Sequence, residues 1–353
     1  MSRTLADLTT LRVGGPVGRL VEASTEEEIV ETVVAADEAG EPLLVLGGGS
    51  NVLAADAGFA GVVVRDARQE IAVESQDACG GAAFWASAGM PWDNLVLRAV
   101  AEGWAGVEAL SGIPGSTGAT PVQNVGAYGQ EVGDVVAMVR TWDRQEKRYR
   151  TLAHGELGLG YRTSILKESL RDRTNAWYPT PRYVVLRVMF QMRLATRSTP
   201  IRYPELARAL DVEVGERVDA AEVRSAVLAL RAGKGMVLDA DDPDTWSAGS
   251  FFTNPVLPEG SALPEGAPQW PAGPGLVKTS AAWLIQRAGF DKGFAVPGGG
   301  AASLSTKHAL AITNRGGARA ADLLALARTV RDGVRDAFAI TLEPEPVLIG
   351  LAL

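Results

Sequence analysis

The chain has 353 residues, enough for two or three domains that each bury a core. Its 42 acidic and 34 basic residues give a net charge of −8, which disfavours nucleic acid as a partner because such binding needs a basic surface. One cysteine and two histidines exclude an internal disulfide and leave too few ligands for a zinc or haem site. No apolar stretch approaches the length of a membrane span, so we expect a cytoplasmic protein without membrane contact or metal.

The N-terminal part of the chain predicts helices and strands around a glycine loop. Ser24 and Glu27 form a predicted capping box for a helix that ends at Gly40. Pro91 suits the first turn of a second helix. The expected elements are a helix over 24–40, strands at 43–46, 61–65, 71–74 and 82–87, and a helix over 91–103.

The remaining elements predict a mixed α+β architecture. Two strands flank a polar, arginine-rich loop, and Asp219 with Glu222 caps a helix that closes at Gly233. The stretch 168–181 fits either a disordered insertion or a loop near the active site. The expected elements are strands at 135–142 and 183–192, a boundary near 195–200, a loop-rich region over 242–274, a helix over 279–289 and a last helix whose apolar face holds Leu323, Ala327, Val330, Val334 and Phe338.

Residues 47–51, Gly-Gly-Gly-Ser-Asn, follow an apolar strand. Three consecutive glycines let backbone N–H groups point at a diphosphate, and Ser50 and Asn51 add donors. The loop lacks the spacing of a Rossmann fingerprint and the Lys-Ser/Thr ending of a P-loop. Taken alone, it fits a plain tight turn equally well.

Residues 113–129 form a second glycine-rich segment, with four glycines, two prolines and no helical or strand period. Glycine permits close approach of the backbone to a ligand, while Pro114 and Pro121 fix φ locally. A simple corner needs only two or three such residues. Two separate glycine-rich segments together favour a long ligand with a diphosphate in its middle.

An ordered set of motifs spans nearly the whole chain: residues 10–16 (TLRVGGP), 47–53, 113–129, 160–164 (GYRTS), 247–255 (SAGSFFTNP) and 342–345 (LEPE). In sequence and in order, these motifs resemble those of the UDP-N-acetylenolpyruvoylglucosamine reductase family, in the branch with a tyrosine loop. The resemblance implies a two-lobed FAD-binding domain of the vanillyl-alcohol-oxidase-like type and a smaller C-terminal α+β substrate domain. We place the two lobes at 1–67 and 68–197 and the substrate domain at 198–353.

The same resemblance implies an oxidoreductase of bacterial peptidoglycan synthesis. Its expected reaction uses non-covalent FAD and NADPH to reduce UDP-N-acetylglucosamine enolpyruvate to UDP-N-acetylmuramate, and we expect a monomer. The residues expected at the FAD are Gly47, Gly48, Gly49, Ser50, Asn51, Gly115, Ser116, Gly118, Asn124, Gly126 and Ala127. Those expected at the substrate are Tyr161, Tyr203, Lys234 and Asn254. Without the resemblance, Tyr203 fits a packed loop aromatic, Lys234 a helix C-terminal lysine and Asn254 a loop asparagine.

Three residues carry the chemistry that the resemblance implies. Ser250 is the acid that protonates substrate carbon, Arg162 holds the enolpyruvyl carboxylate, and Glu345 assists proton delivery or steadies the enol intermediate. Considered without the family, Ser250 fits a turn hydroxyl, Arg162 a surface cation and Glu345 a solvated carboxylate. No nucleophile elbow surrounds Ser250, so a hydrolase is disfavoured.

Two positions depart from the family's pattern. Many relatives carry Lys where this chain has Thr253 and a basic residue where it has Val347. The effect of these two positions on substrate affinity is therefore an open question. Neither His154 nor Cys79 lies in a glycine-rich segment, and we therefore expect no covalent flavin.

Two other functions compete with the reductase. An alcohol or hydroxy-acid oxidase of the same broad fold would lack the motifs around Ser250 and Glu345. A non-catalytic flavin or UDP-sugar sensor would have lost a catalytic residue, whereas Ser250, Arg162 and Glu345 are all present.

Overall fold

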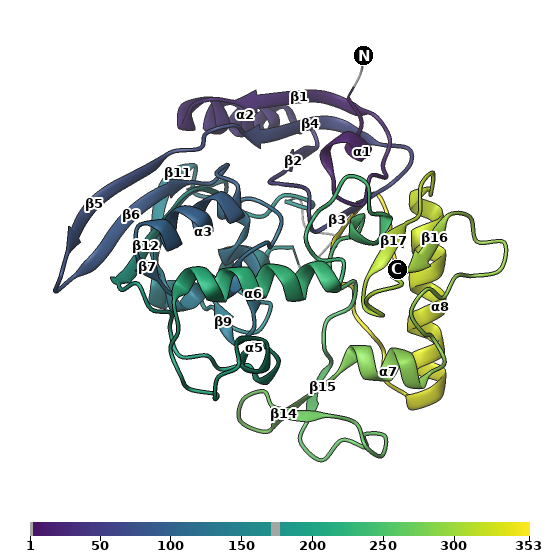
Figure 1. Ribbon diagram of the computed structural model, residues 1–353. Coiled ribbons are helices and arrows are strands. Elements are labelled where there is room, and N and C mark those ends of the chain that lie inside the picture. Colours follow the sequence, from purple (N-terminus) through teal and green to yellow (C-terminus); the bar gives the residue numbers. More distant parts are fainter. Residues whose placement is uncertain (1–2, 171–176) are drawn as a thin grey trace. The chain divides into compact units, whose positions relative to one another are not determined.

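The computed structural model describes residues 3–170 and 177–353, and the described chain forms two compact units (Figure 1). The C-terminal unit combines residues 1–16, 50–59 and 234–353, and the central unit combines residues 17–49 and 60–233. The intermixed helices and strands confirm the α+β class. The domain borders expected at 67/68 and 197/198 stay a prediction. No helix in the described ranges is both long and apolar enough to cross a membrane.

The central unit begins with a three-stranded sheet and one helix. Strand β4 (Phe59–Asp66) lies between β1 (Val17–Ala23) and β2 (Leu43–Val45), and β2 runs parallel to it. Helix α2 (Glu26–Ala39) ends at Gly40, whose φ of +62° is left-handed, as predicted.

The predicted cap of α2 is wrong by one residue. Thr25 rather than Ser24 is the N-cap, and its hydroxyl accepts from Glu28 N at 3.0 Å. The Glu28 carboxylate in turn accepts from Ser24 N at 2.8 Å, so Glu27 takes no part. Thr and Ser are comparable caps, and the geometry of the preceding strand decides between neighbours.

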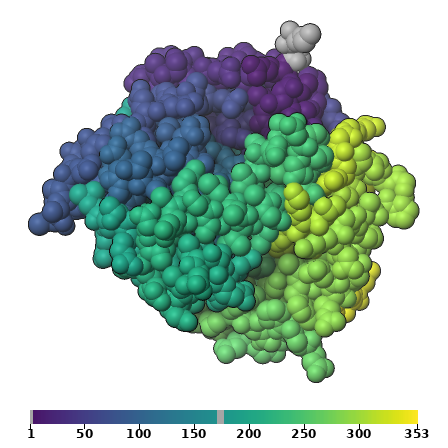
Figure 2. Space-filling view, viewed as in Figure 1, coloured from purple at the N-terminus to yellow at the C-terminus, as the bar shows by residue number. Residues whose placement is uncertain are grey.

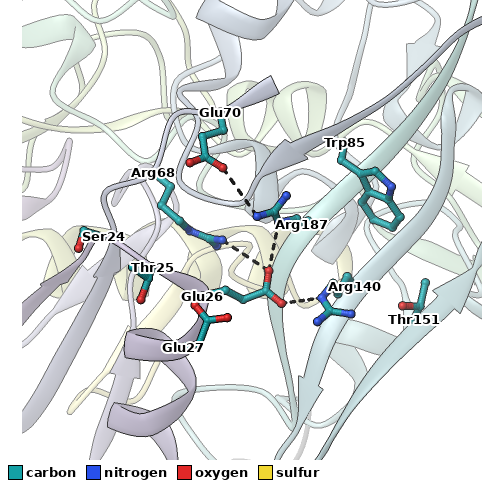
Figure 3. A pocket seen from close by; sticks show the side chains of 10 residues that line it. All are labelled: Ser24, Thr25, Glu26, Glu27, Arg68, Glu70, Trp85, Arg140, Thr151 and Arg187. Atoms are coloured by element: carbon teal, nitrogen blue, oxygen red, sulfur yellow. Dashed lines mark hydrogen bonds and ion pairs between the residues drawn. The ribbon is translucent and has the colours of Figure 1, made fainter. Parts of the chain in front are cut away.

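A network of ion pairs ties the first turn of α2 to the strands of the larger sheet (Figure 3). The buried Glu26 carboxylate accepts from Arg140 Nε at 2.5 Å and from Arg187 Nε at 3.1 Å. Arg68 lies 3.6 Å from the same carboxylate and pairs with Asp66 at 2.7 Å. One buried carboxylate therefore neutralises charge from several elements at once.

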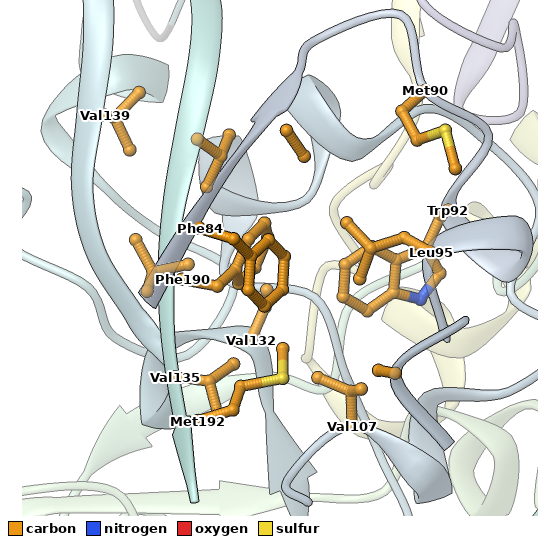
Figure 4. Close-up of a cluster of buried hydrophobic side chains, with 14 of the residues drawn as sticks. Phe84, Met90, Trp92, Leu95, Val107, Val132, Val135, Val139, Phe190 and Met192 are labelled. Atoms are coloured by element: carbon orange, nitrogen blue, oxygen red, sulfur yellow. The ribbon is translucent and has the colours of Figure 1, made fainter. Parts of the chain in front are cut away.

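The larger sheet carries the main core of the central unit. Its strands follow the order β11 (Arg148–Ala153), β10 (Val136–Asp143), β12 (Tyr183–Leu194), β6 (Gly81–Ser87) and β5 (Ile71–Asp77), with β7 (Trp104–Ala105) paired to β12. All the described pairings in it are antiparallel. Phe84 stacks on Phe190, with ring centroids 5.4 Å apart (Figure 4). It also stacks on Trp104, with ring centroids 4.4 Å apart. Helix α3 (Trp92–Ala101) follows Pro91, which is its N-cap rather than part of its first turn.

The polar region between β10 and β12 is more regular than predicted. Strand β11 pairs with β10, so this part of the expected loop is a hairpin arm. Residues 171–176, within the unassigned stretch 168–181, lie outside the described residues. Thr180, at the end of that stretch, accepts from Val45 N at 2.8 Å and donates to Leu43 O at 2.9 Å. Its hydroxyl therefore anchors this end of the stretch on β2.

The β5–β6 hairpin protrudes from the body of the central unit (Figure 2). Most of β5 is exposed, and the hairpin turn carries Cys79, whose amide donates to Asp77 Oδ1 at 2.9 Å. The only cysteine therefore lies in a surface turn outside both glycine-rich segments.

Two further helices of the central unit follow its sheets along the chain. Helix α6 (Ala220–Gly233) has its first turn capped by Asp219, whose carboxylate accepts from Ala221 N at 2.8 Å. This confirms the predicted start and end of the helix. Helix α5 (Pro204–Leu210) was not predicted, because seven residues give too short a periodic signal.

The C-terminal unit packs short strands around two helices. Helix α7 (Ala281–Arg287) and helix α8 (Ala320–Phe338) bury Leu284, Ile285 and the predicted α8 face, of which Phe338 is only partly buried. Strand β18 (Val347–Ile349) pairs in parallel with β3 (Val52–Ala54). The other elements are α1 (Leu5–Leu8), the sheet β13 (Val256–Pro258), β15 (Leu276–Thr279) and β14 (Gln269–Pro271), and the pair β16 (Ala302–Leu304) and β17 (Ile312–Asn314).

Candidate functional site

The two glycine-rich segments meet each other in the central unit. A Cβ atom placed on Gly48 would lie 2.6 Å from Gly115 Cα and 2.9 Å from its carbonyl carbon. A Cβ atom on Gly47 would overlap the Ser116 hydroxyl. These distances are far below van der Waals contact, so only glycine permits this approach. The structure thus brings together residues that sequence reasoning could only place in separate loops.

The junction of these segments presents unpaired hydrogen-bond donors. Among the described residues, no carbonyl accepts from the amides of Gly47, Gly48, Gly49, Gly115 or Ser116. Gly48 is exposed to water, but the other four residues are buried or half-buried, and backbone N–H groups of such residues rarely lack a partner without a reason.

Thr117 adds a buried hydroxyl to the same junction. The residue is fully buried and its Oγ1 has no hydrogen-bond partner among the described atoms. Several backbone amides without an acceptor, next to a buried hydroxyl, suit an anion such as a diphosphate. These residues therefore fit the diphosphate part of a dinucleotide such as FAD.

Short 3-10 turns stiffen the rest of segment 113–129. They are η2 (Thr117–Ala119) and η3 (Pro121–Gln123), and Gly118 packs so closely on Ala88 that a side chain would overlap it. Asn124 follows with a left-handed φ of +46°, which asparagine tolerates. Its amide oxygen accepts from Gly133 N at 2.9 Å, and its amide nitrogen donates to Glu131 at 2.6 Å. Asn124 therefore holds this backbone in place from inside the protein.

Gly126 and Ala127 form a very short strand, β8 (Gly126–Ala127). It pairs with β9 (Gln130–Glu131), and a side chain on Gly126 would lie 3.0 Å from Gln130 O. The β8–β9 turn thus leaves little room for a side chain at this glycine, whatever ligand binds nearby.

Arg162 lies at the tip of a tight turn in the central unit. Gly160 and Thr163 exchange both backbone hydrogen bonds, each at 3.2 Å, so Tyr161 and Arg162 form the turn. Arg162 has a φ of +53°, a left-handed conformation that disfavours a side chain with a Cβ. Its guanidinium carbon lies 5.9 Å from the Tyr161 ring centroid. A strained arginine at a turn tip is typical of a functional position.

Tyr203 is 45% exposed and precedes α5. Its ring meets Tyr128 edge to face, with centroids 5.6 Å apart. Tyr128 belongs to segment 113–129 and has a left-handed φ of +49°. The Tyr203 ring therefore rests on the second glycine-rich segment of its own unit.

Ser250 and Glu345 come together in the C-terminal unit. The chain after Ser250 runs antiparallel to residues 343–345: Glu345 N donates to Phe251 O at 2.9 Å, and Thr253 N donates to Glu343 O at 3.0 Å. Phe251 is fully buried, which fixes the backbone beside Ser250. The half-buried Ser250 hydroxyl has no hydrogen-bond partner among the described residues.

Asn51 contacts the Glu345 segment within the C-terminal unit. Within the C-terminal unit its side-chain amide donates to Glu345 O at 3.3 Å, and its carbonyl accepts from Val347 N at 3.0 Å. Val347 thus continues the β18–β3 pairing. Asn51 therefore positions the chain around Glu345, and Ser50 precedes it in the same unit.

Asn254 and Lys234 have surroundings of a different kind. The Asn254 amide oxygen accepts from Ala281 N at 2.9 Å, which satisfies a donor in the first turn of α7. Lys234 is half-buried directly after α6. Their expected substrate contacts stay a prediction, as does the effect of Thr253 and Val347 on affinity.

A buried carboxylate supports the segment that leads to Ser250. Asp244 accepts from Thr306 N at 2.8 Å, from Thr306 Oγ1 at 2.6 Å and from Arg315 Nη1 at 2.7 Å. Burial by itself raises the pKa of Asp244, but the hydrogen bonds from Thr306 and the charge of Arg315 outweigh burial and lower that pKa below its usual value.

A cavity of about 600 Å³ opens beside the first turn of α2, away from every predicted site residue. Its arginines, Arg68, Arg140 and Arg187, all point toward the Glu26 carboxylate (Figure 3). Because the carboxylates that line this cavity neutralise its guanidinium groups, the ion-pair network described above accounts for the charged lining of the cavity.

Sequence reasoning missed two residues near the candidate site. Thr117 lies inside the second glycine-rich segment, where only its burial distinguishes it from its neighbours. Lys167 donates from Nζ to the Arg162 carbonyl oxygen at 3.3 Å. Its position three residues after the end of the 160–164 motif was the only available signal.

Comparison with known proteins supports the two-part architecture. Residues 17–151 match the family model described as FAD binding domain, and residues 241–349 match the C-terminal domain of UDP-N-acetylenolpyruvoylglucosamine reductase. A crystal structure of UDP-N-acetylenolpyruvylglucosamine reductase from Thermus caldophilus has a TM-score of 0.64 and 28% identity, covering 99% of this chain and 98% of that one.

Curated relatives are similar over nearly the full length. A UDP-N-acetylenolpyruvoylglucosamine reductase of Cutibacterium acnes is 56% identical, covering 99% of this chain and 90% of that protein. Those of Thermobifida fusca and Mycobacterium avium are 52% and 50% identical, each covering 99% of this chain and 97% and 95% of theirs. The chain therefore belongs to the UDP-N-acetylenolpyruvoylglucosamine reductase family, the flavoprotein oxidoreductases of peptidoglycan precursor synthesis.

Proposed function

We propose that this protein reduces the enolpyruvyl group of UDP-N-acetylglucosamine enolpyruvate to give UDP-N-acetylmuramate, with NADPH as hydride donor and non-covalent FAD. The names of relatives that match nearly the whole chain support this reaction. FAD supplies hydride-transfer chemistry when bound, and the protein supplies position and electrostatics. The amides of Gly47–Gly49, Gly115 and Ser116, with the Thr117 hydroxyl, would hold its diphosphate.

The observation that carries the proposal is the pairing of the Ser250 and Glu345 segments. The reaction needs a proton donor for the carbon next to the carboxylate. Ser250 offers a hydroxyl on a rigid backbone, and this hydroxyl has no partner within the described part of the chain. The Glu345 carboxylate lies on the adjoining strand-like segment, where it assists proton delivery or steadies the enol intermediate.

Arg162 binds the substrate carboxylate in this proposal. Negative charge develops next to that carboxylate as the vinyl group is reduced. A guanidinium that is already in place stabilises this charge. A preorganised group of this kind typically lowers a barrier by about 3–4 kcal/mol. Tyr161, Tyr203, Lys234 and Asn254 contact the rest of the substrate.

An anaerobic experiment tests the reaction. The yellow protein is reduced with one equivalent of NADPH, the enolpyruvyl substrate is added, and flavin absorbance is followed without oxygen. We expect rapid return of the oxidised spectrum. In D2O, product formed by the wild-type protein should carry one solvent deuterium on the carbon beside the carboxylate.

The Ser250→Ala variant separates the proton donor from hydride supply. We expect NADPH to reduce its flavin normally, while reoxidation by substrate slows by about 10²- to 10⁴-fold. A wild-type flavin that stays bleached until air is admitted would refute the proposal and favour the oxidase. A flavin that NADPH does not reduce would favour the sensor.

A further inference from the structure

The turn that presents Arg162 is fastened to the second glycine-rich segment by one short helix. Helix α4 (Ile165–Glu168) begins immediately after the turn, and its N-cap Ser164 donates from Oγ to Val122 O at 2.5 Å. The same Ser164 hydroxyl accepts from Lys167 N at 3.3 Å. Ser164 therefore fixes the start of α4 against the 3-10 turn η3.

Lys167 makes the second connection, and this one reaches Arg162 itself. Its ammonium donates to the Arg162 carbonyl oxygen at 3.3 Å and to Gln123 Oε1 at 3.2 Å. Gln123 is the last residue of η3, directly before the left-handed Asn124. One half-buried lysine thus joins the backbone of the arginine to the segment that lines the flavin part of the central unit.

The conformation of Arg162 explains why such a connection matters. Its left-handed φ of +53° is unfavourable for any residue with a Cβ, so the isolated turn would relax toward negative φ. A rotation of this kind would redirect the guanidinium. A donor on the Arg162 carbonyl oxygen holds the peptide plane and opposes that rotation, because the plane cannot turn without breaking the bond.

We propose that Lys167 is a positioning residue for Arg162. Through its bonds to the Arg162 carbonyl and to Gln123, it holds the 160–163 turn in the strained conformation that aims the guanidinium at the substrate carboxylate. This inference rests on the proposed function, in which Arg162 binds that carboxylate. Lys167 itself does not touch the reacting atoms.

The two half-reactions of the holoenzyme separate this role from a general structural one. In Lys167→Met the apolar stem remains but the donor is lost. We expect flavin reoxidation by the enolpyruvyl substrate to slow by about 10- to 100-fold, since misplacing a binding group by about 1 Å has effects of this size. Flavin reduction by NADPH should stay within about twofold of wild type, because that half-reaction does not involve the substrate carboxylate.

Three further variants complete the design. Lys147→Met is the matched control, since Lys147 is an exposed lysine in the same unit whose ion pair with Glu38 is 3.7 Å long, and we expect it to leave both half-reactions unchanged. Lys167→Arg restores a charged donor and should recover part of the lost rate. Gln123→Leu removes the second anchor, so it should slow the same half-reaction even if Lys167→Met folds poorly.

A double-mutant cycle with Arg162→Ala decides between positioning and direct substrate contact. If Lys167 acts through Arg162, adding Lys167→Met to Arg162→Ala should slow reoxidation by less than about twofold further. A full additional loss would overturn the inference, because it would place Lys167 on the ligand.

The remaining outcomes separate failure of the inference from failure of the proposed function. Wild-type reoxidation in Lys167→Met, together with slow reoxidation in Arg162→Ala, would overturn the inference alone. Equal losses in both half-reactions of Lys167→Met would also overturn it. Wild-type reoxidation in Arg162→Ala would instead overturn the role that the proposed function gives to Arg162.

Discussion

The contact between the two glycine-rich segments predicts a specific defect in Gly48→Ala. The new Cβ would lie 2.6 Å from Gly115 Cα, about 1 Å inside the normal separation of carbon atoms. The Gly115 atoms at this contact belong to the backbone, so no flexible side chain can rotate away from the new Cβ. Overpacking of this kind typically costs about 1–3 kcal/mol. Separation of the segments would also move the unpaired amides of Gly48 and Gly115 apart.

We expect this cost to appear mainly as weaker FAD binding. The apoprotein can relax by opening the junction, whereas FAD binding requires the amides to converge. A cost of about 1–3 kcal/mol corresponds to a Kd for FAD about 5- to 150-fold higher. The measurement is titration of apoprotein with FAD, followed by flavin fluorescence, with thermal unfolding of the apoprotein recorded in parallel.

Gly155→Ala is the matched control, because its φ is not left-handed and nothing lies within 4 Å of the added Cβ. We expect its FAD affinity and stability to equal those of wild type. The reasoning would be refuted if Gly48→Ala also bound FAD with wild-type affinity and melted at the wild-type temperature. A lower melting temperature with unchanged affinity would place the contact in the folded core but outside the cofactor site.

Three further variants test buried polar groups. Thr117→Val removes a hydroxyl that has no partner among the described residues, at nearly constant volume. It should raise the Kd for FAD about tenfold in the fluorescence titration without lowering apoprotein stability. Unchanged affinity would exclude a hydrogen bond from this hydroxyl to the cofactor. Glu26→Gln should lower the free energy of unfolding by about 2–3 kcal/mol in urea titrations, because it leaves the surrounding arginines without a negative charge. Wild-type stability of this variant would contradict the ion-pair network in Figure 3. The lowered pKa of Asp244 stabilises the fold above the pKa of the unfolded carboxyl, near pH 4, and this stability is lost as the pH falls through the lower pKa of the folded state. Asp244→Asn should therefore flatten the acid side of a curve of stability against pH. An unchanged slope would count against this cause.

Local patterns predicted the longer helices and most long strands well. The apolar face of α8 repeats every three to four residues, and the Asp219 cap and Gly233 mark the ends of α6. Such signals act between residues a few positions apart, so the sequence contains them in full. Where neighbouring residues compete for one role, as Ser24 and Thr25 do at the cap of α2, tertiary geometry chose the other candidate.

The sequence by itself also determined the family, the two glycine-rich segments and the residues expected to carry the chemistry. Only the tertiary structure decided that Gly48 lies against Gly115, that Glu345 pairs beside Ser250, and that Lys167 holds Arg162. Each of these contacts depends on how the surrounding chain folds, through burial, strand pairing and backbone conformation. Local propensity reports only the preferences of a residue and its near neighbours, and therefore carries no information on which of the many compatible partners a folded chain will select.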